Sequence, residues 1–183
     1  MQIVKRSGAL EEFTPQKIAA ALHKAFASVN KPADEALIEG LTAAVIARIN
    51  SQDPVSVEQI QDYVEETLME AKYFKVAKSF ILYREKRAQL RQTRQALCAA
   101  VSDSSLINTL KRIEALFPDE QYHLDKLCSK FFAEVRQSAG AAEKMASLIK
   151  AAVELTTPQS PRYENIAALL YLHALNARIA KTE

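Results

Sequence analysis

Apolar side chains recur at every third or fourth position along most of the chain, and this spacing predicts amphipathic helices. The first helix is expected to start at Pro15, behind an N-cap hydroxyl at Thr14, and to break at residues 30–32. Its expected buried positions are Ile18, Ala21, Leu22, Ala25, Phe26 and Val29.

Three more helices are expected in the first half. Asp34 is predicted to cap the second, and residues 50–54 are predicted to form a loop. Ser56 and Gln59 form an S-x-x-Q capping box for the third, and the fourth is expected over about residues 74–100. The predicted buried positions of the second and third helices are Leu37, Leu41, Ala44, Val45, Ile49, Val57, Ile60, Val64 and Leu68.

The stretch before the first helix has a different pattern and predicts a β-hairpin. Ile3–Arg6 is expected to be one strand, Ser7-Gly8 a turn that tolerates positive φ, and Ala9–Phe13 the returning strand. So small a hairpin is not stable alone, so it must pack on helices, with Ile3 or Val4 and Phe13 as contacts. The first half is therefore predicted to be mainly α, a small N-terminal β-hairpin on a four-helix layer.

Residues 101–183 show no second hairpin and predict four further helices. Gly140 is expected to separate two of them, and residues 157–161 are predicted to form a loop. The expected inward positions are Leu106, Leu110, Ile113 and Phe117; Leu124, Leu127, Phe131 and Val135; Met145, Leu148, Ile149, Ala152 and Val153; Ile166, Ala167, Leu170 and Ala174.

A weak internal repeat relates the two halves. Ile60, Val64 and Leu68 are paired with Met145, Ile149 and Val153, and, after a five-residue insertion, Tyr73, Val76, Ala77 and Phe80 with Tyr163, Ile166, Ala167 and Leu170. The second copy lacks the hairpin and the basic residues near it. It is therefore predicted to be a scaffold without a phosphate site.

Composition narrows the functional classes. The chain has 183 residues and a formal net charge of +2, which is no overall nucleic-acid signature, and no apolar run reaches the roughly 20 residues of a membrane span. Cys98 and Cys128 lack a CxxC partner, which favours reduced thiols in a cytoplasmic protein. His23, His123 and His173 are scattered without metal-ligand spacing and are expected at the surface or at interfaces. No nucleophile–base pair is evident, so this chain is not expected to be an enzyme by itself.

Cations gather where the hairpin meets the first helix. Lys5 and Arg6 sit beside the tight turn and Lys17 follows in the first helical turn, where it opposes the helix dipole. A helix start with flanking Lys and Arg is a good place for a polyphosphate, whereas a solvated basic turn is the simpler interpretation.

Two motifs resemble the ATP-cone, a nucleotide-sensing module at the N-terminus of ribonucleotide reductase large subunits. The first is V-K-R-S-G at residues 4–8, followed by Glu11 or Glu12, Phe13 and Lys17-Ile18; Ser7 stands where the family more often has Asp. The second is V-E-Q-I-Q-D-Y-V-E-E-T-L-M at residues 57–69, Y-F-K-V-A-K at 73–78 and I-L-Y-R-E-K-R at 81–87. The resemblance covers nearly all of residues 1–95 and predicts a regulatory domain at 1–100, followed by a helical domain at 101–183.

The resemblance implies a set of roles. Lys5, Arg6 and Lys17 would hold the phosphates, and Lys86 or Arg87 would close the site from the fourth helix. Glu11 matches an acidic position that faces the base in the family. Val4, Phe13, Ile18 and Ile60 would form the apolar bed for adenine. Gln61 and Thr14 replace the commoner His and Asn of the family, which leaves base and sugar discrimination open.

The resemblance also implies ligands and partners. ATP or dATP, with Mg²⁺, would be the allosteric effector, and ATP would leave the enzyme active while dATP switches it off through quaternary structure. The partners would be the remainder of the large subunit, other large subunits and the radical-generating small subunit. Residues 148–156 and 166–170 resemble the segment that leads into the catalytic barrel, so the chain is expected to be an N-terminal fragment.

Other hypotheses stay open. A nucleic-acid-binding helix would use a basic stripe on the fourth helix, formed by Lys72, Lys75, Lys78, Arg84, Lys86, Arg87, Arg91 and Arg94; the distal arginines could equally be a solvated face. A transcription regulator with a cone would normally carry a zinc ribbon ahead of the hairpin. A degenerate cone with only a structural role is the third alternative.

Overall fold

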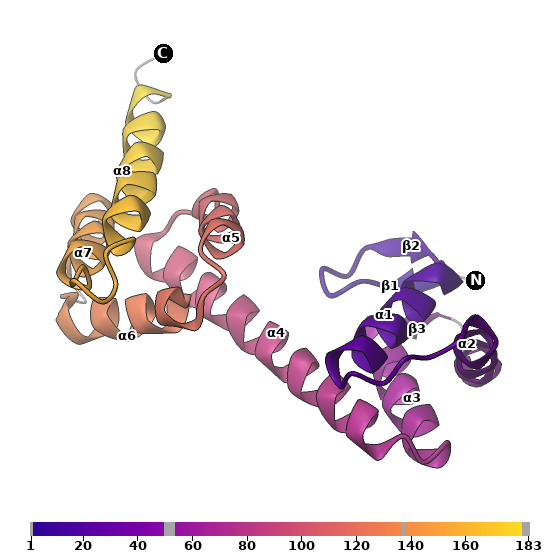
Figure 1. Cartoon of the computed structure of the whole chain (residues 1–183). Coiled ribbons are helices and arrows are strands. Elements are labelled where there is room, and N and C mark those ends of the chain that lie inside the picture. Colours follow the sequence, from indigo (N-terminus) through magenta and orange to yellow (C-terminus); the bar gives the residue numbers. More distant parts are fainter. Residues whose placement is uncertain (1, 50–53, 137, 181–183) are drawn as a thin grey trace. The chain divides into compact units, whose positions relative to one another are not determined.

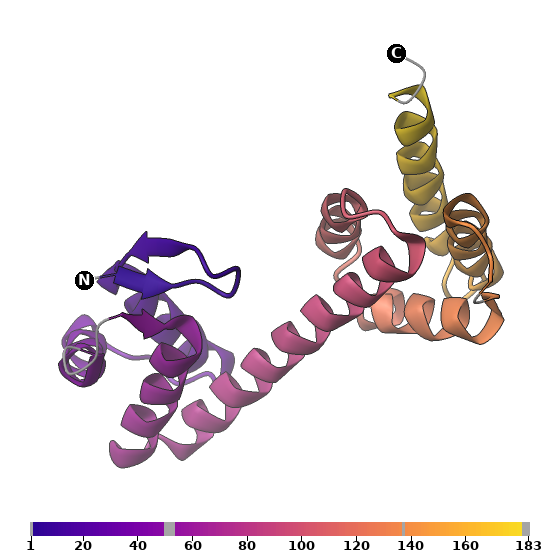
Figure 2. The same ribbon diagram turned by 180° about the vertical axis from the view of Figure 1, so that it is seen from behind.

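A computed structural model describes residues 2–49, 54–136 and 138–180. The chain forms two compact units, Met1–Lys86 and Arg87–Glu183, each with its own apolar core. Figures 1 and 2 show the two units from opposite sides. Among the described residues, no helix has the length and apolar character needed to cross a bilayer. The fold class predicted from the sequence, mainly α with a small N-terminal sheet, is confirmed.

The sheet of the first unit has one strand more than the predicted hairpin. β1 (Gln2–Val4) pairs antiparallel with β2 (Leu10–Glu12) and parallel with β3 (Val55–Ser56), in the order β2-β1-β3. Val55 is fully buried, which explains why so short a strand is held in place. The predicted first strand extended too far, because Lys5 and Arg6 lie in the turn. Most of the predicted loop at residues 50–54 falls outside the described residues.

Four helices carry this sheet: α1 (Pro15–Ser28), α2 (Glu35–Ile49), α3 (Val57–Glu70) and the first part of α4 (Phe74–Val101). Asp34 accepts a hydrogen bond from the Leu37 amide at 2.8 Å, and Ser56 and Gln59 form the predicted capping box. Thr14 is the N-cap residue of α1, but its side chain makes no capping hydrogen bond. Pro15 at the first turn supplies the start signal instead.

The second unit consists of the end of α4 with α5 (Leu106–Leu116), the 3₁₀ helix η1 (Glu120–Tyr122), α6 (Leu124–Glu134), α7 (Ala141–Glu154) and α8 (Tyr163–Ile179). Tyr163, Phe131 and Leu110 are almost fully buried in its core. Burial raises the pKa of the Tyr163 phenol to about 12, and its hydroxyl donates to the Gln121 carbonyl at 3.0 Å.

Two polar residues of this unit have side-chain partners on other segments, and one of the two is buried. Arg94, placed by the sequence on a basic stripe, is 5 % exposed and forms an ion pair with Glu114. His173, predicted at the surface or at an interface, lies between two partners, with Nε2 2.8 Å from the Asp103 carboxylate and Nδ1 3.1 Å from the Thr109 hydroxyl. The prediction for Arg94 failed because helical periodicity does not reveal a polar residue whose partner lies on another helix, whereas His173 lies where α8 contacts α5.

The internal repeat is present, but its first part was aligned one residue out of register. α3 and α7 both have 14 residues, and at the third helical position of each a side chain, Gln59 or Glu143, accepts from the amide of the N-cap residue. In this register Leu68 corresponds to Ala152, and both are fully buried. The predicted pairing of Leu68 with Val153 is wrong, because Val153 is 55 % exposed.

The second part of the repeat keeps the predicted alignment. Val76, Ala77 and Phe80 on α4 are buried, as are Ile166, Ala167 and Leu170 on α8.

Candidate functional site

The hairpin turn presents its two basic residues together. The Lys5 amide donates to the Ala9 carbonyl at 2.8 Å, and the Gly8 amide donates to the Lys5 carbonyl at 2.9 Å. Gly8 has φ of +81°, a left-handed conformation in which a side chain would be strained. This closed turn fixes the backbone at Lys5 and Arg6, and both side chains are exposed.

A single carboxylate joins the turn to the first helix. Glu11 Oε2 lies 3.0 Å from Lys5 Nζ, and Glu11 Oε1 lies 3.0 Å from Lys17 Nζ. Hydrogen bonds from Lys5 and then Lys17 lower the pKa of the Glu11 carboxyl below its ordinary value. Three of the predicted site residues are therefore linked through the Glu11 carboxylate.

Arg6 reaches a different element. Its Nε lies 2.5 Å from a carboxylate oxygen of Glu58, and a terminal nitrogen donates to the Gln61 amide oxygen at 3.0 Å. Both partners lie on α3, so Arg6 holds the turn against that helix. The structure thus brings Gln61 beside a cation that was expected to contact phosphate.

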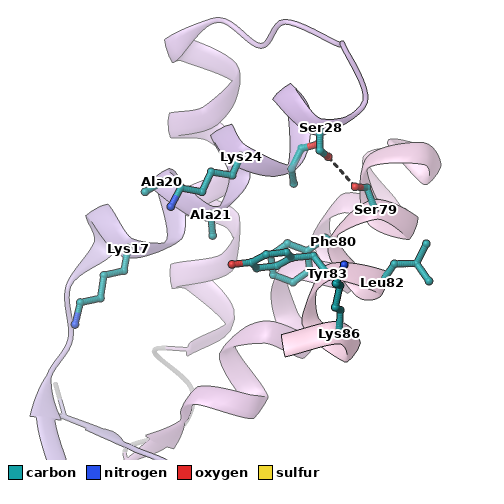
Figure 3. Close-up of a pocket in the computed structure, with 11 residues that line it drawn as sticks. Lys17, Ala20, Ala21, Lys24, Ser28, Ser79, Phe80, Leu82, Tyr83 and Lys86 are labelled. Carbon is teal, nitrogen blue, oxygen red and sulfur yellow. Dashed lines mark hydrogen bonds between the residues drawn. The ribbon is translucent and has the colours of Figure 1, made fainter. Parts of the chain in front are cut away.

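A cavity of about 720 Å³ lies between α1 and α4 of the first unit. Figure 3 shows Lys17 and Lys24 coming from α1, with Tyr83 and Leu82 from α4. The lining residues are Lys17, Ala20, Ala21, Lys24, Ala25, Ser28, Ser79, Phe80, Leu82, Tyr83 and Lys86. The Ser28 and Ser79 hydroxyls are 2.7 Å apart and join the two helices beside the cavity.

Charge and apolar surface are combined in this cavity. Its walls are largely apolar, formed by alanines of α1 and by Phe80, Leu82 and Tyr83 of α4. Three lysine side chains border it, and within the described part of the chain neither Lys24 nor Lys86 forms an ion pair with a carboxylate. Such a site suits a ligand with a flat apolar part and several negative charges, and ligand pockets usually have volumes of about 300–1,000 Å³.

The other predicted site residues do not line this cavity. Ile18 is 5 % exposed and belongs to the core, while Phe13 and Ile60 pack against the same core and are half-buried. Val4 ends β1 and Thr14 precedes α1, both half-buried. Arg87 is the first residue of the second unit and is not part of this group.

Lys17 and Lys86 are the two predicted residues that line the cavity. The remaining lining residues were not predicted, and Lys24 and Tyr83 are the most informative of them. One signal was available: on α1 Lys17, Ala21 and Lys24 follow helical spacing on one face, and on α4 Ser79, Tyr83 and Lys86 do the same.

The first half of the chain matches a known protein family. The family model described as "ATP cone domain" matches residues 1–89. Residues 1–89 are an ATP cone domain. The cavity and the hairpin cations all lie within this match.

Relatives of the whole chain extend beyond the ATP cone. The ribonucleoside-diphosphate reductase subunit alpha of Treponema pallidum is 40% identical over 179 residues, which cover 94% of this chain and 21% of that protein. The vitamin B12-dependent ribonucleoside-diphosphate reductase of Thermoplasma acidophilum is 35% identical over 157 residues, covering 81% of this chain and 20% of that protein.

A more distant relative is the anaerobic ribonucleoside-triphosphate reductase of Haemophilus influenzae, 30% identical over 141 residues that cover 72% of this chain and 20% of that protein. The chain therefore spans about a fifth of the length of these curated relatives. The ATP cone and its reductase relatives together support a nucleotide-sensing regulatory region.

Proposed function

We propose that the first unit binds ATP or dATP with the apolar part of the nucleotide in the cavity between α1 and α4. The triphosphate then lies toward Lys17, Lys24 and Lys86. The observation that carries this proposal is the cavity itself, in which three lysines border walls made largely of Ala, Phe, Leu and Tyr side chains. Ammonium groups form strong charge-assisted hydrogen bonds with phosphate, and aromatic rings such as Tyr83 stack on nucleobases.

The hairpin supplies the other side of the phosphate site. Lys17 lines the cavity while its ammonium group contacts Glu11, and Glu11 also contacts Lys5. This chain of contacts supports the hypothesis that cations from the hairpin and from α4 act on one triphosphate. Arg6 contributes through its position at the turn, while Arg87 lies in the other unit.

Mg²⁺ would be held at this site mainly by the nucleotide phosphates rather than by protein side chains. The described residues contain no group of three or more His, Cys, Asp or Glu side chains suited to holding a metal. Mg²⁺ typically keeps several waters and takes one or two carboxylates besides nucleotide phosphates, and the Glu11 carboxylate contacts Lys5 and Lys17. Bound in this way, Mg²⁺ neutralises phosphate charge.

The proposed consequence of binding is regulation of a ribonucleotide reductase. ATP leaves the enzyme active and dATP inhibits it, and the two nucleotides differ only in the ribose 2′-hydroxyl. Such a switch requires the two effectors to favour different quaternary arrangements, because a ligand shifts an equilibrium only by its difference in affinity for the two states. The proposed partners are the remainder of the large subunit, other large subunits and the radical-generating small subunit.

The nucleic-acid alternative loses support in two places. Arg84 pairs with Asp62 and Glu65 on α3, and Arg94 is buried against Glu114. Those two guanidinium groups of the basic stripe stabilise the fold and already have carboxylate partners.

Isothermal titration calorimetry with Mg-ATP and Mg-dATP tests the ligand directly. We expect saturable binding of both, and the double variant Lys17→Ala plus Lys86→Ala should weaken it about a hundredfold, since each lost charge-assisted contact costs about tenfold. Lys126→Ala, an exposed lysine of the second unit, is the matched control and should bind normally. Absence of ATP and dATP binding by the unaltered chain would contradict the proposal.

Quaternary control needs a separate measurement. Sedimentation velocity of the full-length reductase with ATP and then dATP is expected to give two different distributions of oligomers. The same distribution with both effectors would contradict regulation through quaternary structure, while leaving nucleotide binding intact.

A further inference from the structure

The cations at the two sides of the nucleotide site are not equally available. Lys24 and Lys86 line the cavity, and within the described residues no carboxylate pairs with either. Lys5 and Lys17, in contrast, both contact the carboxylate of Glu11, each at 3.0 Å. The hairpin side of the site thus already holds an anion that belongs to the protein.

The position of Glu11 follows from the sheet. It lies on β2 opposite Ile3 of β1, and its side chain is one-third exposed between the lysine that follows β1 and the lysine in the first turn of α1. Because successive residues of a strand point to opposite faces, the neighbouring Glu12 presents its side chain to the other face. The pairing is therefore specific to one of two adjacent glutamates.

We infer that Glu11 is a built-in competitor for the phosphate groups, so that a triphosphate reaches Lys5 and Lys17 only by displacing the Glu11 carboxylate. This inference rests on the proposed function and specifies how that site is set to a weaker affinity than its cations alone would give. If the Glu11 carboxylate stays in place, it repels the phosphates. If it is displaced, its two ion pairs with Lys5 and Lys17 are lost. In both cases Glu11 lowers the affinity of the site for polyanions.

The resemblance to the ATP-cone implies a different role, in which this acidic position faces the base. The two roles predict opposite results for a ligand that has phosphates and no base. A competitor for phosphate must weaken the binding of inorganic tripolyphosphate, while a residue that contacts only the base has no effect on it.

Titration of three proteins with inorganic tripolyphosphate and with ATP separates these roles: the unaltered chain, Glu11→Gln and Glu12→Gln. The two variants make the same change of charge on adjacent residues of one strand. Glu11→Gln is expected to bind both ligands about tenfold more tightly, because each exposed ion pair that no longer has to break is worth up to about fivefold. Glu12→Gln should change either affinity less than about twofold.

A second variant guards against a change of structure at the hairpin. Glu11→Gln combined with Lys5→Gln removes one of the freed cations and should lose most of the gain, with an unaltered far-ultraviolet circular dichroism spectrum for all variants. Should Glu11→Gln leave tripolyphosphate binding unchanged or weaken it, the inference is wrong, and weaker binding of ATP alone would assign Glu11 to the base.

The outcomes also separate this inference from the proposed function. ATP binding by the unaltered chain without a gain in Glu11→Gln overturns only the competitor role. No binding of ATP by any of the proteins overturns both, and binding that emerges only in Glu11→Gln supports the competitor role while contradicting a working sensor.

Discussion

The two units use the same helix pair in different ways. The pair α3 with α4 and the pair α7 with α8 share a first helix of 14 residues, a side chain that accepts from the N-cap amide of that helix, and a buried row on the second helix. In the register of that row, Tyr83 of α4 corresponds to His173 of α8. Tyr83 is 62 % exposed beside the cavity, whereas His173 is hydrogen-bonded to Asp103 and Thr109.

This difference shows that the same pair of helices can either leave a cavity or fill it. We call the position of Tyr83 in the first unit the open position and the position of His173 in the second unit the closed position. In the first unit α1 and α4 face one another across a cavity. In the second, α5 and α8 are joined at the corresponding position, because the His173 ring bridges the hydroxyl of Thr109 and the carboxylate before α5. A polar side chain with two partners fills the place where the first unit keeps room for a ligand.

The largest expected effect concerns the arginines of α4, one in each unit. Arg94→Ala should lower the free energy of unfolding by about 3–5 kcal/mol, because it removes the ion-pair partner of the half-buried Glu114 and the packing of a buried side chain. Arg84→Ala removes ion pairs that are more exposed and should cost about 1 kcal/mol or less. Urea denaturation followed by circular dichroism measures both, and equal losses would show that the two arginines play the same structural role.

The register of the repeat can be tested next. Leu68→Ala should destabilise the chain by about 2–5 kcal/mol, because it opens a cavity at a fully buried position. Val153→Ala, the residue that the misaligned repeat paired with Leu68, should change stability by about 0.5 kcal/mol or less, since Val153 is exposed. A large loss for Val153→Ala in the same denaturation experiment would restore the rejected register.

The closed position in the second unit should give a pH-dependent stability. Burial raises the pKa of Asp103, but hydrogen bonds from Ser105 and His173 outweigh this, so its pKa is lower in the folded protein. A lowered folded pKa means that Asp103 stabilises the fold above its unfolded pKa and loses this effect as the pH falls through the folded value. Asp103→Asn should cost about 1–3 kcal/mol at pH 7.

Urea unfolding between pH 7 and pH 3 checks this sign. The gap in stability between the unaltered chain and Asp103→Asn is expected to narrow as the pH falls below about 4. Asp119→Asn, at an exposed carboxylate, is the control and should show a small gap at every pH. A gap that widens in acid would contradict the assignment.

The open position should matter for ligand affinity alone. Tyr83→Ala is expected to weaken ATP binding about tenfold, or ~1.4 kcal/mol, because a base stacked on an aromatic ring gains about 1–3 kcal/mol. His173→Ala removes the corresponding side chain of the second unit and should leave the affinity unchanged while lowering stability. Calorimetric titration of both variants tests the contrast, which disappears if Tyr83→Ala binds ATP normally.

Helix caps give the smallest expected difference. Ser56→Ala should cost about 1 kcal/mol, because the serine accepts from the Gln59 amide in a complete capping box. Thr14→Ala should cost less than about 0.5 kcal/mol, since its hydroxyl makes no capping hydrogen bond. A thermal melt of each variant is sufficient, and equal shifts would mean that the Thr14 hydroxyl caps α1 in solution.

Local signals in the sequence determined the helices, the turn and the caps. Gly8 can adopt positive φ, Pro15 can start a helix, and Ser56 with Gln59 can cap one, so residues within one turn of each other contain the information. The apolar spacing likewise identified most of both cores, but it missed the fully buried Ile38 and wrongly placed Ala44 and Val153 inward, where the structure has them exposed. The same signals failed for β3, because two residues have no period and Val55 is a strand only by pairing with Ile3.

Tertiary structure decided which polar groups meet. Nothing in the periodicity distinguishes the buried Arg94 from exposed basic residues of α4, because its partner Glu114 lies on another helix. The cavity is also a property of two helices together, which is why Lys17 and Lys86 were predicted and Lys24 and Tyr83 were not. Sequence spacing fixes the face of each helix, and only packing determines what that face opposes.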